Sequence, residues 1–182
     1  MPNIEFLIRA NQPPTSLPEA LNDLSDASML FALSWANGDI DRAARASRSA
    51  PKLFDFIISS LMRTRDDFAS GANVPANQAF MASLRVVAGR MATPVTRADQ
   101  ESVVLAGHGN GRLPPNAPIV DATLEQVLNK VKHQITRMQN FRVSGGQHFM
   151  LISADKARSP DCVLEFDVAE FCNKCRDAHS LL

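Results

Sequence analysis

The spacing of apolar residues changes toward the C-terminus, and this change rules out an all-helical chain. In the first part of the sequence apolar residues recur every three to four positions, as Leu53, Ile57 and Leu61 do. This is the period of a helix with one buried face. Near the C-terminus, residues 148–152 and 162–166 are two short apolar runs joined by a loop, which is the pattern of a β-hairpin. We therefore predict an α+β fold, with a helical N-terminal lobe followed by a small antiparallel sheet.

Proline and glycine residues divide the helical part into segments. Pro51 and Pro75 suit the first turn of a helix. Amide hydrogens there have no partner within the helix, so proline, which lacks this hydrogen, breaks no hydrogen bond. Residues 92–120 are rich in both residue types and are predicted to form a long loop with one strand at 103–105. The predicted helices cover residues 18–36 (or from 25), 39–48, 51–70, 75–91, 121–138 and 168–178.

Length and charge limit the class of protein. The chain has 182 residues, which suits an extended arm over 1–17 and one folded domain over 18–182. Lys and Arg number 19, and so do Asp and Glu, so no basic excess favours nucleic acid as a partner. We find no apolar run of ~18 residues, the length a membrane span needs, and no Sec-type signal pattern. The expected location is therefore cytoplasmic, or inside a host cell after secretion without a Sec signal.

Two residues at the ends of the predicted hairpin strands suggest part of a catalytic site. His148 begins the first strand, and Asp167 follows the second. In an antiparallel pair the start of one strand lies beside the end of the other, so the imidazole and the carboxylate would be within reach. A carboxylate beside an imidazole fixes its tautomer and supports its charged form, as in a nucleophilic triad. Residues of these types at strand ends are also common on ordinary protein surfaces.

An early segment resembles the nucleophile motif of papain-like cysteine peptidases. Beginning at Ser28 it runs S-M-L-F-A-L-S-W, which is similar to the cysteine motifs of ovarian-tumour (OTU) deubiquitinases and of YopT-type effector proteases. In both comparisons the cysteine falls on Ser28. The later segments Q-H-F-M-L-I-S and L-E-F-D-V-A-E-F resemble the YopT-type pattern around the catalytic histidine and aspartate, and favour that family.

The resemblance implies a papain-like fold and a set of site residues. Ser28 would stand where the nucleophile lies, at the N-terminus of a long helix, where a thiol is activated. His148 would act as the base and Asp167 would orient it. Asn22, six residues before Ser28, would supply the oxyanion-hole amide, although a helix cap or a surface amide is an alternative role. The implied function is a cysteine peptidase that acts on a host or partner protein and needs no cofactor.

A serine at position 28 departs from the family pattern, because a hydroxyl has a much higher pKa than a thiol. The chain would then be an inactivated variant, a natural pseudoenzyme or a Ser-His-Asp enzyme. Two further functions remain open: an OTU-like deubiquitinase, with ubiquitin as the partner, and a non-enzymatic helical interaction or adaptor protein.

Two other motifs suggest ligands but are better explained without them. Cys172 and Cys175 have the spacing of zinc ligands, and Cys162 and His179 are the remaining candidates. An odd number of cysteines without a signal peptide favours free thiols, so we predict buried thiols and no metal. The glycine-rich run at 107–112 could cradle a phosphate, but it lacks the Gly-Lys-Ser/Thr of a Walker motif. We predict a flexible loop that borders the cleft.

Overall fold

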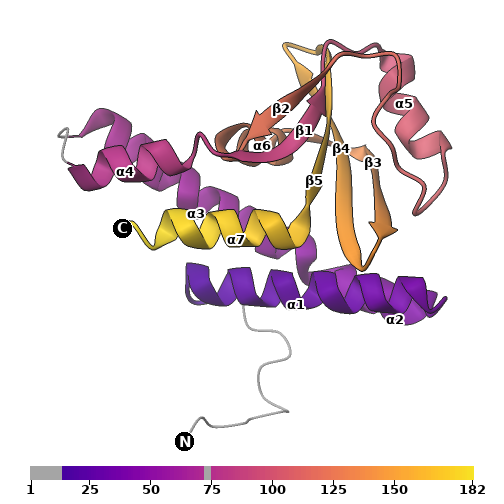
Figure 1. Cartoon of the computed structure of the whole chain (residues 1–182), viewed down its shortest axis with the longest axis horizontal. Helices are drawn as coiled ribbons and strands as arrows, with labels where there is room; N and C mark the ends of the chain where they lie inside the picture. Colours follow the sequence, from indigo (N-terminus) through magenta and orange to yellow (C-terminus); the bar gives the residue numbers. More distant parts are fainter. Residues whose placement is uncertain (1–13, 72–74) are drawn as a thin grey trace, which may run out of the picture.

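The structure is a computed structural model, and it describes residues 14–71 and 75–182 of the chain (Figure 1). The predicted α+β class is confirmed. Most of the predicted N-terminal arm lies outside the described residues, and Leu17 already begins the first helix. No helix in the described ranges is long and apolar enough to cross a membrane. The elements are α1 (Leu17–Ala36), α2 (Ile40–Ala46), the 3-10 helix η1 (Ser47–Ser49), α3 (Ala50–Ser70), α4 (Pro75–Ser83), β1 (Val87–Ala92), α5 (Arg97–Leu105), β2 (Ile119–Thr123), α6 (Leu124–Lys132), β3 (Gln134–Ser144), β4 (Gln147–Lys156), β5 (Ser159–Asp167) and α7 (Val168–His179).

The sheet has five strands in the order β2-β1-β5-β4-β3, and all neighbouring strands are antiparallel. β4 and β5 are the predicted hairpin. Their turn is formed by Ala157 and Arg158, which both have positive φ values, 50° and 68°, as a tight two-residue hairpin turn requires. The strands therefore extend into residues 154–161, which the sequence assigned to a loop.

Each face of the sheet carries an apolar core. Helices α1, α3, α6 and α7 enclose the larger one, which includes Leu24, Leu128 and Phe166, each at most 2% exposed. Helix α5 covers part of the other face, where Val103 packs in a smaller core with Leu151. Figure 1 shows α1 and α7 running side by side below the sheet, with the turn between β3 and β4 directed at α1.

Local signals in the sequence explain where the helices begin. Ser16 caps α1 by accepting a hydrogen bond from the amide of Glu19, and Asp39 caps α2 in the same way. The capping box predicted at Thr123 and Gln126 is present at the start of α6. Such caps satisfy amide hydrogens that have no partner within the helix.

Three predicted segments are wrong, and in each the tertiary environment overrides the local pattern. The helix predicted over 75–91 ends at Ser83, and β1 follows it. The helix predicted over 121–138 ends at Lys132, so its last apolar residues belong to β3. The strand predicted at 103–105 is the end of α5, and β2 was not predicted. Apolar residues spaced three or four apart fit a helix, but short stretches of them also fit a strand buried on one face.

Candidate active site

Ser28 and His148 lie in contact between the first helix and the sheet. Ser28 comes from α1 and His148 from β4. Ser28 Oγ and His148 Nδ1 are 3.0 Å apart, a hydrogen bond between residues 120 positions apart in the chain. The serine is 7% exposed. The structure therefore brings together the predicted nucleophile position and the predicted base.

The imidazole of His148 is enclosed by aromatic rings. The ring of Phe31 stacks on it, with centroids 4.5 Å apart and an angle of 20° between the planes. Phe141 lies edge-on to it at 6.1 Å. Burial in these surroundings lowers the pKa of His148 from an ordinary 6.5 to about 4 because the charged form loses its hydration. The imidazole is therefore neutral near pH 7, and its low pKa makes it a weak base.

Asp167 lies near His148 in the sheet, but no hydrogen bond joins them. The register pairs Asp167 with Phe149, so the pairing places Asp167 on the sheet face of Phe149 and not on that of its neighbour His148. Asp167 Oδ1 accepts a hydrogen bond from the amide of Glu170, 2.8 Å away, and so caps α7. Asp167 Oδ2 and His148 Nε2 are both buried and without a partner among the described residues. The predicted contact between the base and its acid is thus not made.

The oxyanion-hole assignment of Asn22 is corrected by the structure. Asn22 lies on α1 six residues before Ser28, which is about 9 Å along a helix axis at 1.5 Å per residue. Its side chain is exposed, and its Oδ1 accepts a hydrogen bond from Arg176 Nη2 on α7, 3.2 Å away. Asn22 therefore links two helices and does not contribute to the site of Ser28.

The position of Ser28 within α1 also differs from the expectation. The helix has 20 residues, and Ser28 lies near its middle. Amide hydrogens in the interior of a helix are already bonded to carbonyl groups one turn earlier, and the field of the helix dipole acts within the first turn. Neither the free amides nor the positive field of a helix N-terminus is available to a nucleophile here.

The cysteines are buried and are not paired with each other. Burial raises the pKa of Cys162 to about 11 and that of Cys172 to about 12, and it raises that of Cys175 well above its ordinary value. Within residues 14–71 and 75–182, no group of three or more His, Cys, Asp or Glu residues is arranged to hold a metal ion. The buried state of the thiols agrees with the prediction, and their high pKa makes them poor nucleophiles.

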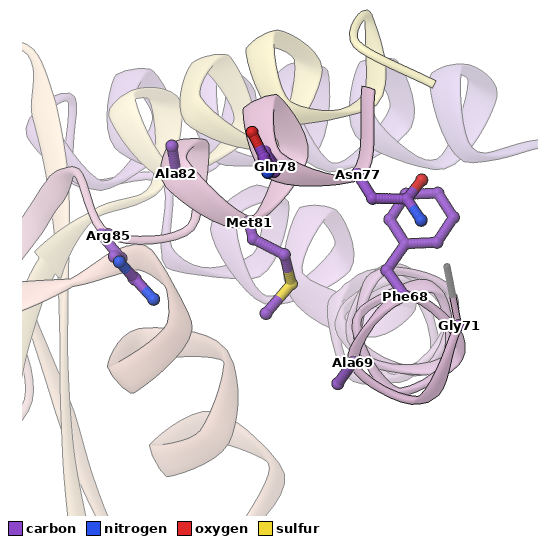
Figure 2. Close-up of a pocket in the computed structure, with 8 residues that line it drawn as sticks. All are labelled: Phe68, Ala69, Gly71, Asn77, Gln78, Met81, Ala82 and Arg85. Carbon is purple, nitrogen blue, oxygen red and sulfur yellow. The ribbon is translucent and has the colours of Figure 1, made fainter. Parts of the chain in front are cut away.

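The surface cavities among the described residues include two that are lined by neither Ser28 nor His148. The first, of about 370 Å³, lies between the end of α3 and α4. Figure 2 shows its lining, which includes Phe68, Met81 and Arg85. The second, of about 360 Å³, lies beside β1 and the start of α7, where Phe149 and Asp167 both line it. Phe149 and Asp167 line the same cavity because the register of β4 and β5 places them opposite each other on one face of the sheet.

A buried ion network on β5 was not predicted. Glu165 has a side chain only 5% exposed, and it forms ion pairs with Arg90 on β1 and with Arg142 on β3, the latter at 2.9 Å. Arg142 also lies over the ring of Phe149, 4.3 Å from its centroid. The sequence feature that could have predicted this network is Glu165 within the otherwise apolar run 162–166, since a buried carboxylate needs a charged partner.

Comparison of the chain with family models, with curated proteins and with solved structures found no match.

Proposed function

We propose that this chain is a papain-like, peptidase-type protein in which Ser28 holds the nucleophile position and His148 acts as the base, without a hydrogen bond to the predicted acid Asp167. The observation that carries the proposal is the 3.0 Å contact between Ser28 Oγ and His148 Nδ1. A neutral imidazole with one nitrogen on the hydroxyl of a serine is the arrangement in which a base takes the proton of a nucleophile during attack. The proposed substrate is the polypeptide chain of a host or partner protein.

The serine form is proposed to hydrolyse peptides weakly or not at all. A hydroxyl, unlike a thiol, is not ionised in advance by a neighbouring imidazole. The middle of α1 offers no helix N-terminus to stabilise an anion, and a base whose pKa is about 4 takes protons poorly near pH 7. The chain is thus proposed to behave as a pseudoenzyme.

The test replaces serine by the residue that the resembled families use. The Ser28→Cys variant should react with a peptidyl epoxide at position 28, because the new thiol lies beside His148. The three native thiols provide a low background, since Cys162 has a pKa of about 11 and Cys172 of about 12, against an ordinary 9.0. Two to three pKa units correspond to a ~100- to ~1,000-fold smaller thiolate fraction near pH 7. Mass spectrometry of peptic fragments locates the adduct.

His148→Ala in the Ser28→Cys background should slow the reaction by at least about tenfold, because the loss of a catalytic group usually costs more than that. His133→Ala is the matched control, since His133 is exposed at the end of α6, and it should leave the rate unchanged. Equal reactivity at position 28 with and without His148 would contradict the proposal.

Ubiquitin separates the peptidase from the OTU-like alternative. The chain with Ser28 should not retain ubiquitin in a pull-down or in a titration followed by NMR if it is a plain peptidase-type protein. Saturable capture of ubiquitin, lost on substitution of Ser28 by a bulky residue such as phenylalanine, would instead favour the deubiquitinase assignment.

A further inference from the structure

We propose that Phe31 is a positioning residue for His148, and that Trp35, Phe141 and the glycine loop 107–111 hold Phe31 in place. The ring of Phe31 would keep the imidazole in the plane that directs Nδ1 at Ser28. The inference rests on the proposed function only in giving His148 the role of a base. Its geometry stands on contacts that are independent of any catalytic activity.

One turn of α1 supplies both groups that contact the imidazole. Ser28 and Phe31 are three residues apart in the same helix, so their side chains share one face. Ser28 Oγ meets Nδ1 at 3.0 Å, and the ring of Phe31 covers one flat side of the imidazole at 4.5 Å. An offset stack of two flat rings restricts rotation of either ring about its side-chain bond.

Phe31 is itself fixed by two further rings. Phe141 on β3 meets it edge to face, with centroids 4.8 Å apart and planes at 85°. Trp35, one turn further along α1, lies parallel to Phe31 with centroids 6.2 Å apart, and it meets Phe141 edge to face at 4.6 Å and 88°. Phe31 is only 8% exposed. The four rings therefore form one cluster between α1, β3 and β4, with His148 as its only titratable member.

The glycine loop closes this cluster from outside. Gly109 has a φ of +81°, and a Cβ atom built on it would lie 2.6 Å from Cζ2 of Trp35. Real Cβ atoms do not approach so closely, so the loop reaches the indole only because position 109 is glycine. The close contact with Trp35 explains why position 109, within the glycine-rich run at 107–112, is glycine.

Asn140 attaches the loop to the strand that carries Phe141. Its Nδ2 donates to the carbonyl oxygens of Val103, at 2.6 Å, and Gly107, at 2.8 Å. Its Oδ1 accepts from the amides of Gly109, at 3.2 Å, and Phe141, at 2.8 Å. The side chain is buried and uses both amide hydrogens and its oxygen. The loop is therefore held in one place, in contrast to the flexible loop that the sequence predicted.

The test measures the titration of His148 by NMR of its imidazole in the chain with Ser28. In the unsubstituted chain the midpoint should lie near the pKa of about 4 that burial produces. Phe31→Leu keeps an apolar side chain but removes the flat ring, so water reaches the imidazole and the midpoint should rise by about one unit or more. Gly109→Ala displaces Trp35 without touching Ser28 or His148, and should raise the midpoint by a smaller amount.

Phe54→Leu is the matched control, because Phe54 packs on Phe166 and Phe171 in the larger core and should leave the midpoint unchanged. If Phe31→Leu does not fold, Gly109→Ala decides the question. Folded variants that titrate like the unsubstituted chain would overturn the inference and reduce Phe31 to a packing residue. A shifted midpoint together with an unreactive Ser28→Cys thiol would keep the inference and refute the peptidase-type function.

Discussion

Acid should destabilise this protein through His148, and the structure gives the size of the effect. The imidazole has a pKa of about 4 in the folded chain against an ordinary 6.5, the value expected for an exposed imidazole in the unfolded chain. The difference of about 2.5 pKa units corresponds to about 3 kcal/mol in the free energy of unfolding. Because the pKa is lower in the folded chain, the unfolded chain binds the proton first as the pH falls. Stability should therefore decline below pH 6.5, and this contribution should be fully lost below about pH 4.

The assay compares the unsubstituted chain with His148→Asn by urea unfolding at several pH values. Asparagine keeps a polar group where Nδ1 meets Ser28 but does not titrate. Between pH 7 and pH 5 the unsubstituted chain should lose about 2 kcal/mol more than the variant. With a urea dependence of about 2 kcal/mol per molar, the midpoint should move by about 1 M more.

Other groups titrate in both proteins, so their contributions cancel in the comparison. Asp155, for example, has a pKa lowered first by its hydrogen bond to Arg97, and its effect is the same in the two chains. His148→Phe also has no titrating group at position 148. Relative to this second variant, the unsubstituted chain should lose the same extra stability between pH 7 and pH 5. Parallel loss of stability in the unsubstituted chain and in both variants would refute the buried, neutral state of His148.

Three further substitutions test other contacts. Ser28→Ala leaves His148 without a hydrogen-bond partner among the described residues, and thermal or urea unfolding should show a loss of about 1–3 kcal/mol. Glu165→Gln removes a buried charge shared by two arginines and should cost about 1–3 kcal/mol, less than for a fully buried pair because Arg90 is 57% exposed; an unchanged urea midpoint would contradict this. Gly89→Ala places a Cβ 2.7 Å from the carbonyl oxygen of Glu165, so it should destabilise the sheet by about 1–3 kcal/mol in the same assay.

The fold was predictable from the sequence where the spacing of apolar residues or a capping residue fits only one type of secondary structure. The stripe of α3 and the cap of α6 lie at residues whose local signals agree with the tertiary structure. The segments around β1 and β3 were not predictable, because their apolar residues continue the spacing of the helices before them. Only pairing with β5 and β4 makes them strands, and such pairing joins residues far apart in the sequence.

The site was predictable in part for the same reason. A motif early in the chain and a histidine in the hairpin led to Ser28 and His148, and both lie at one contact. The place of Asp167 depends on the register of β4 and β5, where a shift of one residue moves a side chain to the other face of the sheet. The sequence does not define the register to one residue, and it does not show that Phe31 and Phe141 meet across 110 positions.

The contact between α1 and β4 sets an order of events during protein synthesis. The ribosome releases α1 early, but the strand that its buried face covers is made much later, because Ser28 and His148 are 120 residues apart. Until then the larger core, to which Leu21 and Leu24 belong and in which they are at most 1% exposed, lacks the residues of β4, β5 and α7. A nascent chain with exposed apolar helices attracts chaperones and is prone to aggregate. Ribosome-bound chains that stop before β4 should therefore carry more bound chaperone than chains that extend beyond α7.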